Sequence, residues 1–289
     1  SLKAPSALVI VLHGYSSSAE TIMTYSQMNK IADENGFLVA YPQGSLDSRN
    51  NPFFNVGYEF HSDNTTNDVA FIEGIVEQIQ ARYAVDPKQI FATGMSNGGD
   101  MSYLLACRSS DVFRAVAPIA GSMMIRTMQQ CEADTATPIL AISGTDDPVT
   151  LYAGDRENSG GWGSYAGQPE TVTFWVDQMK LQKTGSQTLN NSHQPLFFAD
   201  STVICERHSS ADNEVEMLFY RVDGGGHDWP GAKTADWWDL RQYAGLYGMG
   251  FGKNRDISAS KEIWDFFAHW IERDDTTDTR HKASSACLR

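Results

Sequence analysis

The sequence predicts an α/β fold in which helices flank a mainly parallel central sheet. Five short runs are nearly continuous in apolar residues rather than alternating, which is typical of parallel strands buried on both faces. Longer amphipathic stretches separate these runs, which favours right-handed crossovers in a doubly wound sheet. No linker, internal repeat or low-complexity run divides the 289 residues, so we expect a single domain.

The predicted elements follow the chain in alternation. We expect buried strands at 8–12, 37–41, 90–93, 116–119 and 139–142. We expect helices at 68–83, 97–107, 170–181 and 262–271, the first of them closed by Asp86-Pro87. The domain is expected to cover 1–273, and the polar tail 274–289 to be poorly ordered.

Two long segments interrupt this alternation. Residues 151–168 are rich in glycine and aromatic side chains, among them Trp162, and residues 231–254 carry Trp237 and Trp238. Long irregular stretches inside a compact domain are usually functional, so we expect both loops to lie over a site. The alternative is that their aromatic side chains only anchor the loops to the body of the domain.

Composition excludes several classes of protein. The apolar fraction of 41% and the aromatic fraction of 11% exclude intrinsic disorder of the whole chain. The longest clean apolar run, 8–12, is too short to cross a bilayer, so no membrane partner is expected. With 22 basic against 36 acidic residues, a net charge of −14 and no basic patch, we expect no nucleic-acid partner.

The strongest motif is Gly-Met-Ser-Asn-Gly-Gly at 94–99, between a predicted strand and a predicted helix. G-x-S-x-G in a strand–turn–helix setting is typical of a nucleophile elbow. A sharp turn holds the serine in strained backbone angles, and flanking glycines let neighbouring chains approach without Cβ clashes. The helix that follows directs its dipole at developing negative charge. We therefore predict that Ser96 is a nucleophile.

A serine nucleophile needs a base, and the base needs an acid, in the chain order Ser, Asp or Glu, His in α/β-hydrolases. Two adjacent aspartates, Asp146 and Asp147, follow the predicted strand 139–142. We favour Asp147, because the residue before a proline has an extended backbone, and keep Asp146 as the alternative. The predicted base is His227, in a glycine-rich segment after the apolar run 215–222.

Acyl transfer also needs backbone N–H groups that bind the oxyanion. The first predicted strand ends at Leu12-His13-Gly14-Tyr15, where this architecture places one donor. We predict that the N–H groups of Tyr15 and Asn97 form the oxyanion hole. His13 is expected to organise this loop by hydrogen bonding rather than to transfer protons.

Six segments in combination are informative about the family. They are His-Gly at 13–14, Tyr-Pro-Gln-Gly at 41–44, Asn-Asp-Val-Ala-Phe at 67–71, Val-Asp-Pro at 85–87, Gly-Met-Ser-Asn-Gly-Gly at 94–99 and Gly-Gly-His-Asp-Trp-Pro-Gly at 225–231. With them the chain resembles, from Leu8 to about Trp270, the polyhydroxybutyrate depolymerase / feruloyl esterase family. This group of single-domain, cofactor-free serine esterases overlaps carbohydrate esterase family 1.

The resemblance implies an α/β-hydrolase fold, ester hydrolysis through an acyl-serine, no cofactor or metal, and secretion. It supports Asp147 as the acid and implies that Trp229 lines the substrate cleft. It also implies a disulfide between Cys107 and Cys131. The strands that usually precede the His-Gly strand are missing, so we expect a truncated N-terminus, and no signal peptide is visible.

The four cysteines show no metal-ligand spacing. Scattered cysteines in an acidic, Trp-rich chain fit a secreted or periplasmic enzyme with disulfides, whereas buried free thiols in a cytosolic protein are the alternative. A family cysteine near 181–182 is absent, so Cys205 is either free or paired with Cys287.

The sequence thus predicts a serine ester hydrolase. The expected substrate is a small ester or oligoester, most naturally a feruloyl or other short acyl ester on which the aromatic side chains of Trp162, Trp237, Trp238 and Trp229 stack. Polyhydroxybutyrate oligomers are the alternative substrate, and a non-catalytic glycan- or polymer-binding protein is the alternative function. The oligomeric state is left open.

Overall fold

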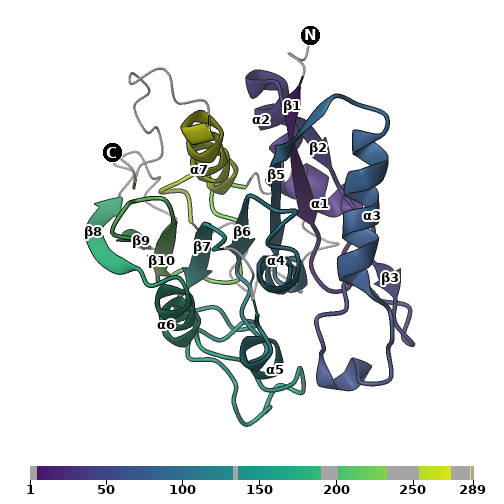
Figure 1. The fold of residues 1–289 in the computed structure, drawn as a ribbon. Helices are drawn as coiled ribbons and strands as arrows, with labels where there is room; N and C mark the ends of the chain where they lie inside the picture. The colour runs from purple at the N-terminus through teal and green to yellow at the C-terminus, as the bar shows by residue number, and fades with distance from the viewer. Residues whose placement is uncertain (1–4, 133–135, 190–200, 233–253, 275–286, 288–289) are drawn as a thin grey trace.

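The computed structural model describes residues 5–132, 136–189, 201–232, 254–274 and Cys287. Within these residues, an eight-stranded sheet forms the centre of the molecule, with strand order β2-β1-β5-β6-β7-β10-β9-β8 (Figure 1). The strands of the sheet are β1 (Ser6–Leu12), β2 (Leu38–Ala40), β5 (Val85–Met95), β6 (Ala115–Ile119), β7 (Ile139–Gly144), β8 (Gln182–Leu189), β9 (Thr202–Ser209) and β10 (Glu216–Asp223).

Six of these strands are parallel, and the antiparallel β9 and β8 complete one edge. The parallel strands β1, β5, β6 and β7 therefore all end at the same edge of the sheet, and ligand sites of α/β sheets form at that edge. The predicted mainly parallel sheet is confirmed.

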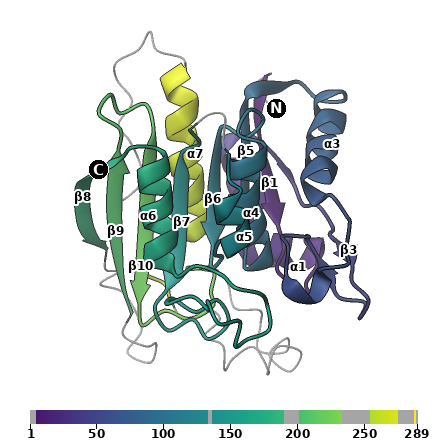
Figure 2. The same ribbon diagram turned by 60° about the horizontal axis from the view of Figure 1, so that its bottom comes forward.

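Helices cover both faces of the sheet. They are α1 (Ala19–Ser26), α2 (Met28–Asn35), α3 (Asp68–Gln80), α4 (Asn97–Arg108), α5 (Ile125–Gln129), α6 (Gln168–Gln178) and α7 (Ala259–Asp274), with a short 3-10 helix at Glu59–His61. Figure 2 shows α4 and α6 on one side of the sheet and α7 on the other. None of the described helices combines the length and apolar character that a membrane crossing needs.

Two separate hydrophobic cores hold these layers together. The first packs α3, α4 and α6 on one face, with Ile72, Met101 and Trp175 among its buried residues. The second packs α1, α2 and α7 on the other face, around Phe266 and Trp270. Each parallel strand supplies side chains to both cores in alternation, which explains its continuous apolar sequence.

The structure corrects two sequence predictions and adds elements that were not predicted. The segment 37–41 was expected to be buried on both faces, but β2 is half-buried because it is the edge strand of the described sheet. The helix predicted at 68–83 ends at Gln80, and Asp86-Pro87 belong to β5. The helices α1 and α2 and the small hairpin of β3 (Ser45–Leu46) and β4 (Pro52–Phe53) were not predicted.

All four cysteines form disulfides. Cys107 at the end of α4 is bonded to Cys131 after α5, with Cα atoms 5.0 Å apart, so the implied pairing is confirmed. Of the two alternatives for Cys205, the structure shows pairing with Cys287, with Cα atoms 5.9 Å apart. The remainder of the tail beyond residue 274 lies outside the described residues, so its predicted disorder is untested.

Replacing Cys107 and Cys131 together with alanine is expected to lower the free energy of unfolding by about 2–4 kcal/mol, because the bond restricts the unfolded chain. Chemical denaturation at constant temperature measures the change. The matched variant Cys205→Ala/Cys287→Ala opens a longer loop, 82 rather than 24 residues, and is expected to lose at least as much. A Cys107/Cys131 variant as stable as the parent would contradict the expectation.

Candidate active site

The nucleophile elbow is present at the junction of β5 and α4. Ser96 has φ 56° and ψ −120°, a region that non-glycine residues rarely occupy. Its N–H donates to the carbonyl of Ile119 on β6 at 2.9 Å, and its carbonyl accepts from the N–H of Asp100 at 2.8 Å. These two bonds fix the strained turn to a neighbouring strand and to the first turn of α4.

Glycines allow the elbow to lie directly against β1. A Cβ at Gly98 would lie 2.3 Å from the carbonyl oxygen of Leu12, so no larger residue fits there. In the loop after β1, which faces the elbow, a Cβ at Gly14 would lie 3.8 Å from the Ser96 hydroxyl oxygen. The loop after β1 therefore passes beside Ser96, as the oxyanion-hole prediction requires.

Backbone contacts join the loops after β7 and β10. A Cβ at Gly144 would lie 2.2 Å from the carbonyl oxygen of Gly225. The N–H of Asp146 donates to that same carbonyl at 2.9 Å, and the N–H of Thr145 donates to Val222 at 3.0 Å. Backbone contacts alone thus hold the segment of Asp147 against the segment of His227, in addition to the contact between the two side chains.

His227 and Asp147 are in direct contact. The Nδ1 atom of His227 lies 2.8 Å from Oδ2 of Asp147, and both residues are buried. The other carboxylate oxygen of Asp147 accepts the N–H groups of Val149 and Thr150, each at 2.8 Å. Asp146 is exposed, and its carboxylate accepts the hydroxyl of Thr145. Of the two aspartates, the structure therefore brings Asp147 to the imidazole.

The loop after β1 is held by a buried histidine. The ring of His13 donates from Nδ1 to the Gly14 carbonyl at 2.8 Å and accepts at Nε2 from the N–H of Gly44 at 3.0 Å. The bond accepted at Nε2 needs the neutral ring, and burial lowers the pKa of His13 in agreement with that state. His13 thus organises the loop by hydrogen bonding, as predicted.

Tyr15 is fixed by a polar network that the sequence did not reveal. Its hydroxyl donates to Asp47 at 2.6 Å and accepts from the Asn51 amide at 2.8 Å, and Asp47 also lies 3.1 Å from His61 Nε2. Burial opposes the charge of Asp47, but the bonds from Tyr15, Asn51 and His61 outweigh it and hold the pKa of Asp47 below its usual range. The side chain of Tyr15 is therefore anchored one position after Gly14, whose backbone lies beside Ser96.

Asn97 is the first residue of α4, so its N–H has no partner within the helix and is available to an oxyanion. Its buried side chain makes a two-way contact with Phe54, accepting the backbone N–H at 2.7 Å and donating to the carbonyl at 2.9 Å. The side chain of Asn97 therefore joins the elbow to the segment after β4.

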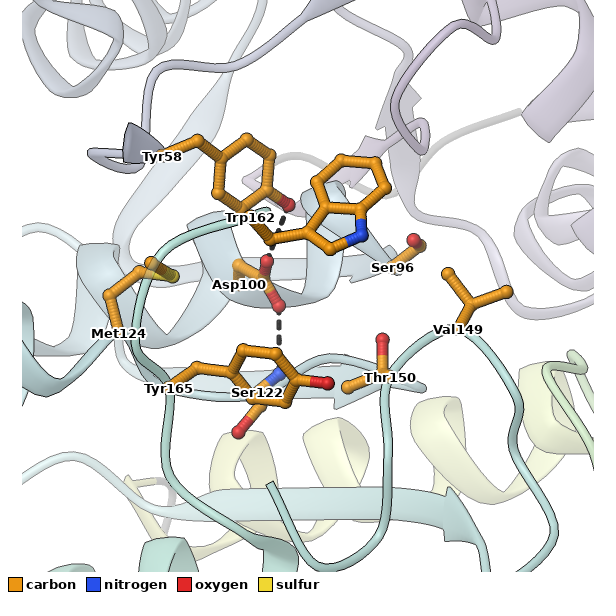
Figure 3. A pocket seen from close by; sticks show the side chains of 9 residues that line it. All are labelled: Tyr58, Ser96, Asp100, Ser122, Met124, Val149, Thr150, Trp162 and Tyr165. Carbon is orange, nitrogen blue, oxygen red and sulfur yellow. Dashed lines mark hydrogen bonds between the residues drawn. The ribbon is translucent and has the colours of Figure 1, made fainter. Parts of the chain in front are cut away.

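A cavity of about 350 Å³, its open mouth included, lies beside Ser96 (Figure 3). Its other lining residues are Tyr58, Asp100, Ser122, Met124, Val149, Thr150, Trp162 and Tyr165. Because Val149 and Thr150 also bind Asp147, the acid turn and the nucleophile border one cavity. Two aromatic residues of the segment 151–168, Trp162 and Tyr165, are thus among the lining residues.

Asp100 is the charged residue among the described residues that line this cavity, and no sequence motif pointed to it. One carboxylate oxygen accepts the Tyr58 hydroxyl at 2.6 Å, and the other accepts the Ser122 N–H at 2.7 Å, as Figure 3 shows. Desolvation outweighs both bonds and raises the pKa of Asp100 to about 6, and the charges of His227 and Asp147 also act on it. The pKa of Asp100 is therefore coupled to the charges of His227 and Asp147.

The predicted substrate-binding tryptophans have different outcomes. Trp162 lines the cavity, as expected. Trp229 is only 1% exposed and its indole N–H donates to Ser260 at 3.0 Å, so the expectation that it lines the substrate cleft is wrong; it packs the loop against α7. Trp237 and Trp238 lie outside the described residues, as does most of the loop 231–254.

Within the part of the chain that the structure describes, no group of three or more His, Cys, Asp or Glu side chains is arranged to hold a metal ion. The buried pair of His227 and Asp147 borders the cavity of Ser96 through Val149 and Thr150. An imidazole held by a buried carboxylate is suited to proton transfer.

Comparison with known families agrees with this geometry. The sequence model described as "Esterase PHB depolymerase" matches residues 3–178, more than half of the chain. The chain belongs to this esterase family. The matched region contains the elbow, the loop after β1 and the turn of Asp147, and it ends before His227.

Individual relatives of this family member are esterases of several kinds. It is 28% identical to feruloyl esterase B of Piromyces equi over 229 residues, 76% of this chain and 39% of the relative. It is 26% identical to poly(3-hydroxyalkanoate) depolymerase C of Paucimonas lemoignei over 174 residues, 60% of this chain and 40% of the relative. The chain thus spans about two-fifths of the length of these curated relatives.

A solved structure shares the fold of this family member. The acetyl xylan esterase from Aspergillus awamori superposes with a TM-score of 0.56 at 15% sequence identity, covering 84% of this chain and 90% of that one. Together with the strand order and the elbow, this likeness confirms the predicted α/β-hydrolase fold.

Gly98→Ala is expected to abolish soluble, active protein or to lower its melting temperature severely, because the new Cβ meets the backbone of β1. Thermal unfolding and ester turnover measure the effect. The matched control is Gly74→Ala in α3, where a Cβ meets nothing within 4 Å and helix propensity predicts a gain of about 0.5–1 kcal/mol. Equal effects of the two substitutions would refute the close-approach argument.

Asp100→Asn is expected to stabilise the fold at about pH 8. A carboxyl whose pKa is raised from 3.8 to about 6 binds its proton more tightly in the folded state, so the stability lost to its charge grows as pH rises from about 4 to about 6 and is fully present above that. The neutral amide can satisfy both Tyr58 and Ser122. We expect a higher melting temperature than that of the parent at about pH 8 and little difference at about pH 4.5.

The control for this prediction is Asp146→Asn, which removes an exposed carboxylate from the same region. Its effect on the melting temperature is expected to be small at both pH values. A gain for Asp100→Asn that does not shrink on acidification would show that the charge of Asp100 is not its cause.

Proposed function

We propose that the chain is a serine ester hydrolase that acts through an acyl-serine intermediate. The observation that carries the proposal is the buried contact of His227 with Asp147, at 2.8 Å, beside the cavity that Ser96 lines. In this proposal the Ser96 hydroxyl attacks the ester carbonyl carbon while His227 takes its proton. Asp147 accepts the Nδ1–H of His227, which sets the tautomer and stabilises the imidazolium.

The oxyanion of the tetrahedral intermediate is bound by the backbone N–H groups of Tyr15 and Asn97. Two features support this assignment: the close approach of the Gly14 backbone to Ser96 and the place of Asn97 at the N-terminus of α4. When the intermediate collapses, His227 gives its proton to the leaving alcohol. Water then attacks the acyl-serine with His227 as base and releases the acid.

The proposed substrates are feruloyl or other short acyl esters, free or attached to a polysaccharide. The similarity to a feruloyl esterase and the aromatic walls of the cavity, Tyr58, Trp162 and Tyr165, support an acyl group that can contact ring faces. Polyester oligomers are the second candidate, favoured by the similarity to a poly(3-hydroxyalkanoate) depolymerase. The complete set of Ser96, Asp147 and His227 speaks against a binding-only role.

We also propose that the protein works outside the cytosol. Two disulfides, Cys107–Cys131 and Cys205–Cys287, form and persist in oxidising compartments, and they support a secreted or periplasmic location. Retention of both bonds in protein isolated from its native host under alkylating conditions tests this proposal.

The catalytic proposal is tested by substitution. Ser96→Ala and Asp147→Asn are expected to lower kcat for p-nitrophenyl acetate and methyl ferulate by about 10⁴-fold or more, because the nucleophile or the correct tautomer is lost. A hydroxybutyrate trimer, assayed alongside, decides between the two substrate candidates by its kcat/KM. Melting temperatures near that of the parent show that the variants are folded.

The matched control is Asp146→Asn, one position before the proposed acid but exposed to solvent. It is expected to keep kcat within about twofold of the parent. Activity of Ser96→Ala comparable to that of the parent, or equal losses in the two aspartate variants, would refute the proposed assignment.

A further inference from the structure

A carboxylate lies in the cavity beside Ser96 that the proposed mechanism does not use. The carboxylate of Asp100 accepts the Tyr58 hydroxyl and the Ser122 N–H, and no step of the proposed mechanism assigns it a role. Resting on the proposed esterase function, we propose that Asp100 and the surrounding aromatic rings form a subsite for a positively charged nitrogen on the acyl part of the substrate. The enzyme would then prefer esters of ammonium-bearing acids.

The first argument is the charge balance of the cavity. No lysine or arginine is among the described residues that line it, so no fixed cation faces Asp100 there. Tyr58 and the Ser122 N–H supply one hydrogen bond to each carboxylate oxygen, which leaves each oxygen with further acceptor capacity. A buried charge held by neutral donors alone is costly, and a cationic ligand would offset that cost.

The second argument is the chemistry of the surrounding walls. The rings of Tyr58 and Trp162 lie at an interplanar angle of 69° with centroids 5.2 Å apart, and Tyr165 lines the same cavity. Figure 3 shows Asp100 between Tyr58 and Tyr165. Aromatic rings that line a cavity beside a carboxylate favour an ammonium group there, through its attraction to the rings and to the anion.

The third argument is position relative to the nucleophile. Asp100 follows Ser96 by four positions, its N–H donates to the Ser96 carbonyl at 2.8 Å, and both residues line the same cavity. The nitrogen that meets Asp100 therefore lies on a short acyl chain, for which we propose about two or three carbons after the carbonyl. The subsite fits a β- or γ-amino acyl group and repels an acyl group with a second carboxylate.

A neutral side chain would also fit at position 100. An asparagine at position 100 could accept the Ser122 N–H and donate to Tyr58, so the local hydrogen bonding does not require a charge. A carboxylate that is kept in a desolvated cleft without a structural need for its charge points to a ligand.

The test uses three methyl esters that differ only in the terminal group. They are methyl 3-aminopropanoate, methyl 3-hydroxypropanoate and methyl butanoate, which present an ammonium, a hydroxyl and a methyl group at the same position. Values of kcat/KM are measured at about pH 7.5 and divided by the rate constant of each ester for hydroxide-catalysed hydrolysis, which removes intrinsic reactivity.

For the parent enzyme we expect the corrected kcat/KM of the aminopropanoate to exceed that of the butanoate by about tenfold or more. In Asp100→Asn this ratio is expected to fall to about one, whereas Asp146→Asn keeps the parent ratio and so controls for the overall negative field. A parent ratio of one or less, or an unchanged ratio in Asp100→Asn, would overturn the subsite. Preference for the hydroxypropanoate over both other esters would also overturn it in favour of a neutral donor.

Turnover of methyl butanoate by the parent separates this proposal from the esterase proposal. If that neutral ester is hydrolysed and the ratio is one, only the subsite fails; if no ester is hydrolysed, the esterase function fails. A second measurement needs no variant. Propylammonium chloride is expected to inhibit butanoate hydrolysis at concentrations at least tenfold lower than 1-propanol at equal ionic strength, and equal inhibition would overturn the subsite.

Discussion

The site depends on one steric constraint, the close backbone approach between the start of α4 and the end of β1. Gly98 allows the elbow to lie against the Leu12 carbonyl, and a Cβ there would be 2.3 Å away. The same approach brings the Gly14 backbone beside Ser96. A second contact of this kind, between Gly144 and Gly225, joins the loops of Asp147 and His227. Backbone packing thus positions the reactive side chains independently of the contacts that these side chains make with one another.

The N-terminus of α4 lies close to two negative charges, the Asp100 carboxylate and the oxyanion of the proposed intermediate. Asp100 lies in the first turn of the helix, and an oxyanion at the N–H of Asn97 would lie at the same end. The helix dipole stabilises both, but a permanent carboxylate disfavours a second anion nearby through Coulomb repulsion. A cation bound at Asp100 in the aromatic-lined cavity would relieve that conflict. The position of Asp100 thus links substrate charge to the energetics of the transition state.

The predictable part of the molecule is the part that local sequence specifies. The elbow was predictable because serine between close glycines has few structural alternatives after a buried strand, and Asp147 and His227 followed from chain order. The role of Asp100 and the contact between Asp47 and His61 were not predictable, because each of these carboxylates binds a residue of another segment. The two bonded residues are 42 positions apart for Asp100 with Tyr58 and 14 for Asp47 with His61. The strands β8 and β9 carry polar, partly exposed residues and so lack the apolar signal.

Trp229 shows a limit of adjacency in sequence. It lies two residues from His227, yet its ring turns away from the cavity and packs among buried residues of the second core near α7. The side chain of a loop residue near a reactive residue can point either into the cavity or into the hydrophobic core, and tertiary packing decides which. The tryptophan that does line the cavity, Trp162, lies on the same connection between β7 and α6 as Asp147 but far from it in sequence.

The bond between Cys205 and Cys287 gives the chain an additional property. It closes a covalent ring over a sequence separation of 82 residues, and this ring includes β10, the segment of His227 and α7. A single proteolytic cut anywhere inside the ring leaves both fragments attached to one another. In a protease-rich extracellular medium, such a nicked molecule would keep its histidine on the same covalent body as its serine, and mass analysis would detect the damage only after reduction.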